Sequence, residues 1–421
     1  MQPFLDSTAL AGNPDALNER LDTEGYLFIR GLLPRSAVLD VRRQVREAAA
    51  AGGWIDRSHP LDEGVANPAA ACTDPEPRYI EVFRKLYVLE ALHTLKHHPA
   101  IVGFFERLFG EPVLVHPLFV MRNIFPQRPE STTPAHQDYP HIQGTPQTYT
   151  TWMTLSDTPM EQGCLSVAAG SHRDGVREFR VTNGSGGMEV VDPMAGRWRA
   201  NGFAAGDVLM FHSMTVHKGL PNLTNRLRQS MDARYQRVSE PVSDLSLRPY
   251  ANLYTWDEIY AGWRSKDFQY YWKKQPITIG EFDTQYYERR DVIAFEMAER
   301  GDSGARASLL RIVQRDKSAA KRERAAALLA ALDAGHLGGA ALDVGRAPDQ
   351  MPAPEFINRP HVIATPHIGG LTQPAIEHQA LETVAQLTQL LKGEMPVGAV
   401  NPDHADRWRR WRERQRDEGA A

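Results

Sequence analysis

The chain has 421 residues, of which 42% are hydrophobic and 24% charged, and its formal net charge is −4, so we expect an ordinary globular protein of two or more units. It carries no long basic stripe, no apolar run of about 18 or more residues and no secretory start, which argues against nucleic-acid partners, membrane insertion and export. Cys72 and Cys164 are the only cysteines, too few for a disulfide scaffold, and a cytoplasmic protein is the expectation.

The first part of the chain alternates helical and extended patterns. Residues 54–78 are rich in Gly, Pro, Asp and Ala and predict a long loop. The expected elements around this loop are a helix over residues 15–21, a strand over 26–30 and helices over 36–45, 80–98 and 100–109.

From residue 113 onward the pattern changes to short apolar runs separated by turn residues, which is typical of antiparallel strands in a sandwich or barrel. The many aromatic residues of 244–290 are expected to pack against this barrel rather than to form a substrate entrance. The expected strands span residues 113–121, 148–155, 164–168, 187–191, 207–212 and 228–237.

Helical patterns return after residue 291. Glycines at 335 and 338–339 then introduce two short apolar runs, and the arginine-rich segment 407–412 is interpreted as solvated surface. The expected elements are helices over 292–299, 306–313 and 317–333, apolar runs over 339–344 and 361–365, and a helix over 374–392.

A candidate metal site begins at His136 and Asp138. If this segment is extended, side chains at positions i and i+2 point to the same face and can reach one point in space. A third ligand should come from a neighbouring strand, where His212 and His217 both qualify. Two histidines and one carboxylate form the facial triad of non-haem Fe(II) oxygenases, which leaves open positions on an octahedral ion.

The open positions of such a metal would take a bidentate 2-oxo acid and O2. The distant carboxylate of the 2-oxo acid needs a fixed cation, and arginine suits this role because its planar fork binds a carboxylate bidentately. Arg226 and Arg228 both lie on or near the strand that follows the candidate ligands, and geometry alone leaves both open.

The sequence resembles the phytanoyl-CoA dioxygenase family of Fe(II)- and 2-oxoglutarate-dependent oxygenases over roughly residues 20 to 240. The resemblance implies a mainly β fold with helical flanks, in which the core is a double-stranded β-helix (jelly-roll or cupin-like), followed here by an α-rich C-terminal extension. We expect an oxygenase domain over residues 1–290, a helical extension over 291–334 and a separate tail over 335–421. The matching segments are residues 25–33, 136–138, 152–157, 163–172 and 206–217.

The resemblance also implies the roles of individual residues. It places the third iron ligand at His217 and the cosubstrate arginine at Arg228, with Trp152 beside the 2-oxoglutarate. His212 then becomes a barrel-wall residue, and His172 is expected to be structural. Candidate substrate contacts on the loop after the first ligands are Tyr139, His141 and Gln147.

The implied activity uses Fe(II), 2-oxoglutarate and O2 to hydroxylate an aliphatic C–H bond of a small metabolite, with release of succinate and CO2. Asp138 favours hydroxylation, because related halogenases carry a small residue at that position. The sequence shows no basic cluster near the site that would single out a CoA thioester or a nucleotide.

The tail carries a second resemblance, in residues 327–344 and 362–370, to D-isomer-specific 2-hydroxyacid dehydrogenases, and His367 falls on the catalytic histidine of that family. No G-x-G-x-x-G turn is present, and dinucleotide binding requires one between a strand and a helix. We therefore interpret the tail as a fused remnant that serves interaction or homodimerisation. The alternatives to the oxygenase are an NAD-dependent 2-hydroxyacid oxidoreductase and a non-catalytic β-barrel binding protein.

Overall fold

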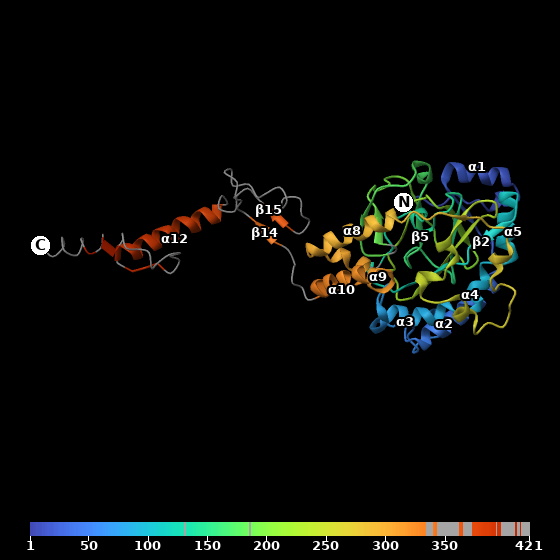
Figure 1. The fold of residues 1–421 in the computed structure, drawn as a ribbon, viewed down its shortest axis with the longest axis horizontal. Helices are drawn as coiled ribbons and strands as arrows, with labels where there is room; N and C mark the ends of the chain where they lie inside the picture. The colour runs from blue at the N-terminus through green and yellow to red at the C-terminus, as the bar shows by residue number, and fades with distance from the viewer. Residues whose placement is uncertain are drawn as a thin grey trace. The chain divides into compact units, whose positions relative to one another are not determined.

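The computed structural model describes residues 1–129, 132–184, 187–333, 340–342, 362–364, 373–392, 394–396, 409–410 and 413. The chain divides into two compact units, residues 1–336 and residues 337–421. Each unit is described by itself (Figure 1).

The first unit is built around an antiparallel sheet in the order β1–β9–β4–β11–β2, with β3 also paired to β11. The expected strand over residues 228–237 is confirmed as β11, which pairs with three other strands. The strands of this sheet are β1 (Tyr26–Ile29), β2 (Val113–Val115), β3 (Val120–Ile124), β4 (Tyr149–Thr154), β9 (Val208–His212) and β11 (Arg228–Arg237).

Side chains alternate between the two faces of this sheet. Leu27 and Ile29 of β1 join a large apolar cluster with the flanking helices, whereas Tyr26 and Phe28 join a smaller cluster on the other face. In the middle of β11, Met231 and its alternate neighbours pack toward the helices. The opposite face of β11 presents polar side chains to the barrel interior, namely Arg228, Ser230, Asp232 and Arg234.

A smaller antiparallel sheet in the order β10–β5–β8 covers the inner face. Leu165 and Val167 of this sheet pack with Trp152 and Phe211 of the larger sheet. Two facing antiparallel sheets of this kind form the double-stranded β-helix core that the sequence predicts. The remaining strands of the core are β5 (Leu165–Ala168), β6 (Phe179–Val181), β7 (Met188–Val190), β8 (Trp198–Arg199) and β10 (His217–Gly219).

The first five helices contribute to the apolar cluster on the outer face of the larger sheet. The single helix expected over residues 80–98 is wrong, because the chain turns at Leu89, which has an extended conformation. The turn lets both Tyr87 and Leu92 be fully buried in the same core, which one straight helix across the barrel would prevent. These helices are α1 (Pro14–Glu24), α2 (Arg35–Ala51), α3 (Pro77–Tyr87), α4 (Glu90–Leu95) and α5 (Pro99–Phe109).

The aromatic segment packs against the barrel, as expected, and the Tyr271 hydroxyl donates a hydrogen bond to the Val115 carbonyl of β2 at 2.7 Å. Tyr250 of this segment also lines a cavity of this unit, so the expectation that the segment forms no part of a substrate site is wrong in part. Trp256 of α7 (Trp256–Tyr260) donates a hydrogen bond to the Leu247 carbonyl at 2.8 Å, and Trp263 donates one to the Val88 carbonyl at 3.0 Å. Two short parallel strands, β12 (Val242–Ser243) and β13 (Ile279–Gly280), bracket this segment.

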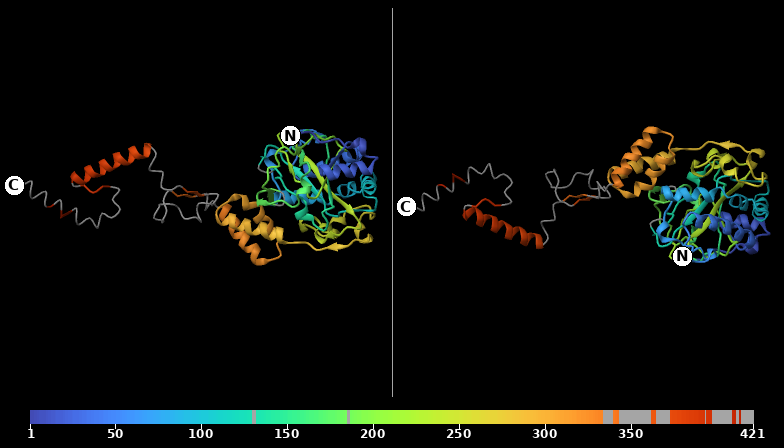
Figure 2. Two further views of the ribbon diagram at one scale, coloured as in Figure 1. Left: turned by 90° about the horizontal axis from the view of Figure 1, so that it is seen from above. Right: turned by 90° about the horizontal axis from the view of Figure 1, so that it is seen from below.

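Three helices follow, drawn in orange in Figures 1 and 2. They pack around an apolar cluster that also includes Val181 of β6. They lie in the same compact unit as the barrel. The first of them spans the boundary at residue 290 at which the sequence divides the oxygenase domain from the extension. The helices are α8 (Gln285–Glu299), α9 (Arg306–Arg315) and α10 (Ala319–Asp333).

In the second unit the described residues form a parallel pair, β14 (Ala340–Leu342) with β15 (Val362–Ala364), and the helix α12 (Gln373–Lys392). The predicted catalytic histidine of the dehydrogenase resemblance, His367, lies outside the described residues. Within the described part of the chain, no helix is both long enough and apolar enough to cross a membrane.

Candidate metal centre

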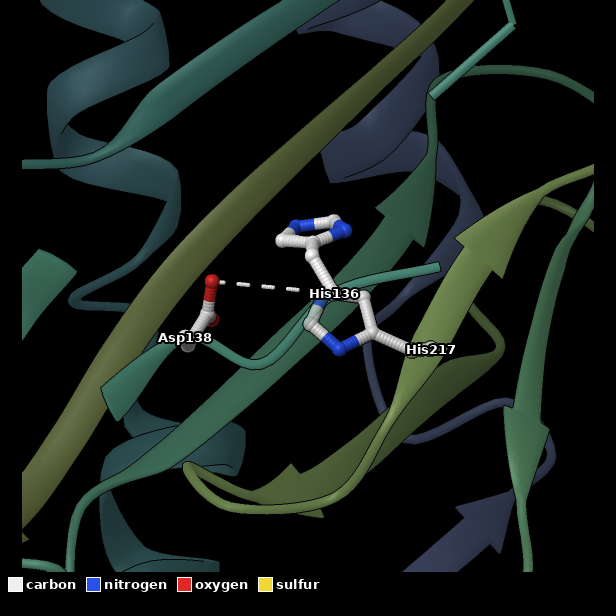
Figure 3. Close-up of side chains that lie close together, drawn as sticks. All are labelled: His136, Asp138 and His217. Atoms are coloured by element: carbon white, nitrogen blue, oxygen red, sulfur yellow. Dashed lines mark ion pairs between the residues drawn. The ribbon is translucent and has the colours of Figure 1, made fainter. Parts of the chain in front are cut away.

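His136, Asp138 and His217 meet inside the barrel (Figure 3). One potential ligand atom from each lies within 4.8 Å of the others, and all three residues are buried. His217 Nε2 lies 3.9 Å from Asp138 Oδ1. Two imidazoles and one carboxylate converging on a point is the donor set of a facial triad.

The way in which His136 and Asp138 converge differs from the expectation. His136 is extended only as far as an isolated antiparallel bridge, in which its N–H and C=O each bond to His217 at 2.9 Å. Asp138 is helical, with φ −74° and ψ −31°, and directly precedes α6 (Tyr139–Ile142). The expectation of one strand with both side chains on one face is therefore wrong. A turn out of the bridge into a helix brings the carboxylate back toward the imidazole.

Backbone hydrogen bonds set the tautomer of both histidines. His136 Nδ1 donates to the Pro134 carbonyl at 2.8 Å, and His217 Nδ1 donates to the Thr215 carbonyl at 3.0 Å. The lone pair of each ring therefore lies on Nε2, the atom left for a metal. Burial lowers the pKa of His136 to about 3 and also lowers the pKa of His217, so both rings are neutral at physiological pH, as metal binding requires.

Asp138 is oriented by two neighbours on the larger sheet. Thr150 of β4 donates a hydrogen bond to its Oδ2, and Arg234 of β11 donates one to its Oδ1 at 3.2 Å. Burial alone would raise the pKa of this carboxyl, but Arg234, the two histidines and the Thr150 hydroxyl together lower it. The carboxylate is therefore ionised and held in one orientation, which suits a divalent cation.

The competing candidates lie elsewhere. His212 ends β9 and accepts a hydrogen bond from the Met214 N–H at 3.1 Å on its Nδ1. It also packs against His172 at 5.4 Å between ring centroids, away from the three converging residues. Arg226 is exposed just before β11, whereas Arg228 is 3% exposed and faces the barrel interior.

Arg228 lies beside the metal-ligating residues in a narrow internal cleft. Trp152, His136 and His217 also line this cleft. The Arg228 guanidinium carbon lies 5.6 Å from the centre of the Trp152 ring, and its Nη1 donates to Ser230 Oγ at 2.6 Å. Its Nε has no hydrogen-bond partner among the described residues. A buried guanidinium with a free N–H and no carboxylate partner in this part of the chain fits the distant carboxylate of a 2-oxo acid.

Sequence reasoning missed the residues that hold the site from the larger sheet, chiefly Thr150, Arg234 and Arg122. Arg122 of β3 forms an ion pair of 2.9 Å with Asp232. The spacing of residues in the sequence could have identified Arg234. Arg234 follows Arg228 by an even number of residues on one strand, so period 2 places both on the same face.

A cavity of about 810 Å³ opens beside the ligands, a volume typical of small-molecule sites. Its walls include His136 and Asp138 and, of the three predicted substrate contacts, only His141. Gln147 is exposed and accepts a hydrogen bond from the Tyr149 hydroxyl at 3.1 Å. Tyr139 also lies outside the lining residues of this cavity.

The helices α8–α10 complete the wall of this cavity. Tyr287 of α8 lies 3.1 Å from His141 Nδ1 through its hydroxyl, within hydrogen-bonding distance. The expectation that no basic cluster lies near the site is wrong, because Arg290, Arg311, Arg315 and Lys321 all line the cavity. These residues come from three helices and are spread over the sequence, so they cannot be recognised from a basic run.

Comparison with known proteins identifies two families along the chain. The family model of phytanoyl-CoA dioxygenase matches residues 21–230, which contain His136, Asp138, His217 and Arg228. The family model of the NAD-binding domain of D-isomer specific 2-hydroxyacid dehydrogenases matches residues 321–369. The second match begins inside α10, a helix of the first unit.

Individual relatives follow the same division. Two 1-deoxypentalenic acid 11-beta-hydroxylases, from Streptomyces exfoliatus and Streptomyces arenae, are 29% and 30% identical over 59% of this chain and 90% and 89% of theirs. D-3-phosphoglycerate dehydrogenase from Bacillus subtilis (strain 168) is 40% identical over 18% of this chain and 14% of its own length. The solved structure of the epimerase SnoN in complex with Fe3+, alpha ketoglutarate and nogalamycin RO is 20% identical, with a TM-score of 0.39, over 56% of this chain and 87% of that one.

Proposed function

The chain belongs to the phytanoyl-CoA dioxygenase family, and from this premise we propose that it is an Fe(II)- and 2-oxoglutarate-dependent dioxygenase that hydroxylates an aliphatic C–H bond of a small metabolite. The observation that carries the proposal is the convergence of His136, Asp138 and His217 with both Nε2 atoms unprotonated. The two Streptomyces relatives are named as hydroxylases of an acid, which supports the reaction class.

His136 and His217 supply neutral Nε2 donors, and Asp138 supplies the anionic one. Thr150 and Arg234 keep the Asp138 carboxylate turned toward the two rings. Such supporting hydrogen bonds raise metal affinity because the ligands lose little freedom when the ion binds. Fe(II) held by these three ligands, with 2-oxoglutarate, supplies the O2-dependent oxidation of a C–H bond, with succinate and CO2 as coproducts.

Arg228 binds the distant carboxylate of 2-oxoglutarate through the N–H groups that have no carboxylate partner in the described protein. The Trp152 ring forms one wall of this position and keeps it narrow. Burial of Arg228 and Trp152 excludes water, which strengthens the charge interaction with the cosubstrate. The substrate then enters from the larger cavity, on the side of His141.

The tail is proposed to be a fused dehydrogenase fragment without a catalytic role. Among the described residues, those that line the cavity all come from the first unit, between Asp74 and Lys321. The dehydrogenase relative is matched over only a small share of its length. Dinucleotide binding also needs a glycine-rich strand–helix turn, which the sequence lacks.

The proposal is tested by adding Fe(II) and 2-oxoglutarate to the protein without O2 and recording the charge-transfer absorption of the ternary complex. We expect this band in the full-length protein and its loss in His217→Ala. The matched control is His212→Ala, because His212 is a buried histidine on the adjoining strand outside the site. Absence of the band in the full-length protein would remove the proposal's support.

A further inference from the structure

The four cations Arg290, Arg311, Arg315 and Lys321, here called the basic cluster, lie on α8, α9 and α10 and line the same cavity as His136 and Asp138. They were not expected to take part in the site, because the sequence sets these helices apart from the oxygenase domain. α9 is anchored to the barrel unit beside the cavity, where Gln314 Nε2 donates to the Pro75 carbonyl at 2.9 Å.

A continuous path of side chains connects the basic cluster to the metal centre. The ring centroids of His136 and His141 are 6.4 Å apart, and the Tyr287 hydroxyl lies 3.1 Å from His141 Nδ1. The Arg290 guanidinium carbon lies 4.9 Å from the centre of the Tyr287 ring. One small molecule can therefore span from the basic cluster to the metal ligands within one cavity.

The carboxylates of the cavity do not match its cations. Eight arginine and lysine side chains and six carboxylates line it among the described residues, and one of the six is the metal ligand Asp138. Within the basic cluster, Asp74 is shared by Arg311 at 3.6 Å and Arg315 at 3.3 Å. Arg290 and Lys321 likewise share Asp291, and Lys321 also pairs with Asp316 at 3.1 Å, so three carboxylates face the four cations. The basic cluster therefore keeps positive charge that its own partners do not cancel.

Arg311 shows this excess most clearly. It is 5% exposed, and its Nη1 has no hydrogen-bond partner among the described residues. Burial, together with the nearby Arg315 and Arg290, lowers its pKa to about 10, and Asp74 opposes the change. A buried guanidinium with an unpaired N–H is unfavourable by itself, and a bound anion would relieve it.

Apolar side chains line the cavity beside these charged groups. Leu118, Val120 and Ile142 contribute from the barrel, and Phe282 and Ile312 contribute from the helical side. A ligand that has both an apolar skeleton and a charged group can meet both kinds of wall. A substrate that was charged throughout would leave these apolar side chains without a partner.

We propose that the basic cluster binds an anionic group, such as a carboxylate, sulfonate or phosphate, of a substrate whose apolar skeleton extends toward the metal centre. The helices α8–α10 are thus part of the substrate site, and their cations orient the molecule so that a C–H bond away from its charged end meets the oxidant. The substrate role rests on the proposed oxygenase function, whereas the anion preference of the cavity does not.

The test uses two fluorescent probes with the same aromatic skeleton, the anion 1-anilinonaphthalene-8-sulfonate and the neutral N-phenyl-1-naphthylamine. Titration of the full-length protein should give an affinity for the sulfonate about tenfold or more above that for the neutral probe, as expected for a charged hydrogen bond. Arg315→Gln should remove most of this difference and leave the neutral probe unaffected. Asp74 retains Arg311 as a partner in that variant.

Arg43→Gln is the matched control, since it removes the same charge from an exposed position on α2 and should change neither affinity. Arg315→Lys should keep the preference for the sulfonate. If Arg315→Gln lowers the melting temperature, Lys321→Gln provides the same test. Of the two carboxylate partners of Lys321, Asp291 keeps Arg290 and Asp316 keeps the Ser318 N–H. Equal affinities for the two probes in the unmodified protein, or variants of the basic cluster that behave as Arg43→Gln, would overturn the inference.

Adding 2-oxoglutarate to the titration separates the two anion sites. The sulfonate should remain bound, and its displacement would place it at Arg228 and overturn the inference. Fe(II)-dependent consumption of 2-oxoglutarate without any anion preference would leave the proposed function standing and the inference wrong. Anion preference in a protein that never consumes 2-oxoglutarate would leave the anion site standing and the proposed function wrong.

Discussion

Replacing Arg228 by glutamine tests the cosubstrate position most specifically. Arg228 is buried without a carboxylate partner among the described residues, so the substitution leaves no orphaned anion behind, and Asp232 keeps its ion pair with Arg122 at 2.9 Å. We therefore expect the protein without cosubstrate to remain folded, while 2-oxoglutarate binding is strongly weakened.

The two effects have different sizes. Removing one partner of a buried charge pair weakens binding by about 2–5 kcal/mol, which is roughly 30- to 5,000-fold in Kd. Burial lowers the pKa of Arg228 to about 10, which corresponds to about 3 kcal/mol against the charged form in the folded protein. Loss of that penalty offsets loss of the hydrogen bond to Ser230 and of the Trp152 contact. The free energy of unfolding without cosubstrate should therefore change by no more than about 1 kcal/mol.

The assay is thermal unfolding with and without 2-oxoglutarate in the presence of Mn(II), together with calorimetric titration of 2-oxoglutarate. Arg226→Gln is the control, since Arg226 is an exposed arginine two residues upstream. The reasoning is refuted if Arg226→Gln abolishes 2-oxoglutarate binding, or if Arg228→Gln binds it as tightly as the unmodified protein.

Three further predictions concern the metal ligands, the pH dependence and the tail. Thr150→Val should weaken Mn(II) binding about 10- to 100-fold, because it removes a hydrogen bond that orients Asp138. The control is Thr151→Val, on the outer face of the same strand, which should not weaken it. Equal Mn(II) affinities of the two variants in calorimetric titration would contradict this prediction. Burial lowers the pKa of His93 and His116 to about 3. The unfolded chain takes up protons on these residues below pH 6.5 while the folded chain does not, so acidification should destabilise the fold by about 2 kcal/mol per histidine at pH 5. Equal free energies of unfolding in denaturant at pH 7 and pH 5 would argue against this burial. A chain ending at residue 336 should consume 2-oxoglutarate at the unchanged rate, since the described cavity residues all precede that point; gel filtration of both chains would show whether the tail mediates dimerisation, and lost turnover would show that it contributes to the site.

The elements with strong local patterns could be predicted from the sequence. β11 agrees with its expected span because its alternation of polar and apolar residues is long and regular. The helix expected over residues 80–98 could not be separated into α3 and α4. Its apolar spacing is continuous, and the turn at Leu89 is required only by the shape of the core that both helices enter.

Prediction of the site from local sequence patterns is limited in the same way. His136 and Asp138 could be found as ligand types, but their convergence depends on a bridge to His217 and a turn into α6, which no local spacing encodes. The basic cluster could not be predicted at all, because its members meet only when three helices pack beside the barrel. Charge that is scattered along a sequence becomes a site through tertiary structure alone.

The central claim is an oxygenase built on His136, Asp138 and His217, and the most direct measurement is succinate formed from 2-oxoglutarate by the purified protein under air. We predict succinate that requires added Fe(II), stops with a chelator and is absent in Asp138→Ala. Succinate formation that persists in Asp138→Ala would contradict the account. So would a metal-loaded protein that forms no succinate during a long incubation without substrate.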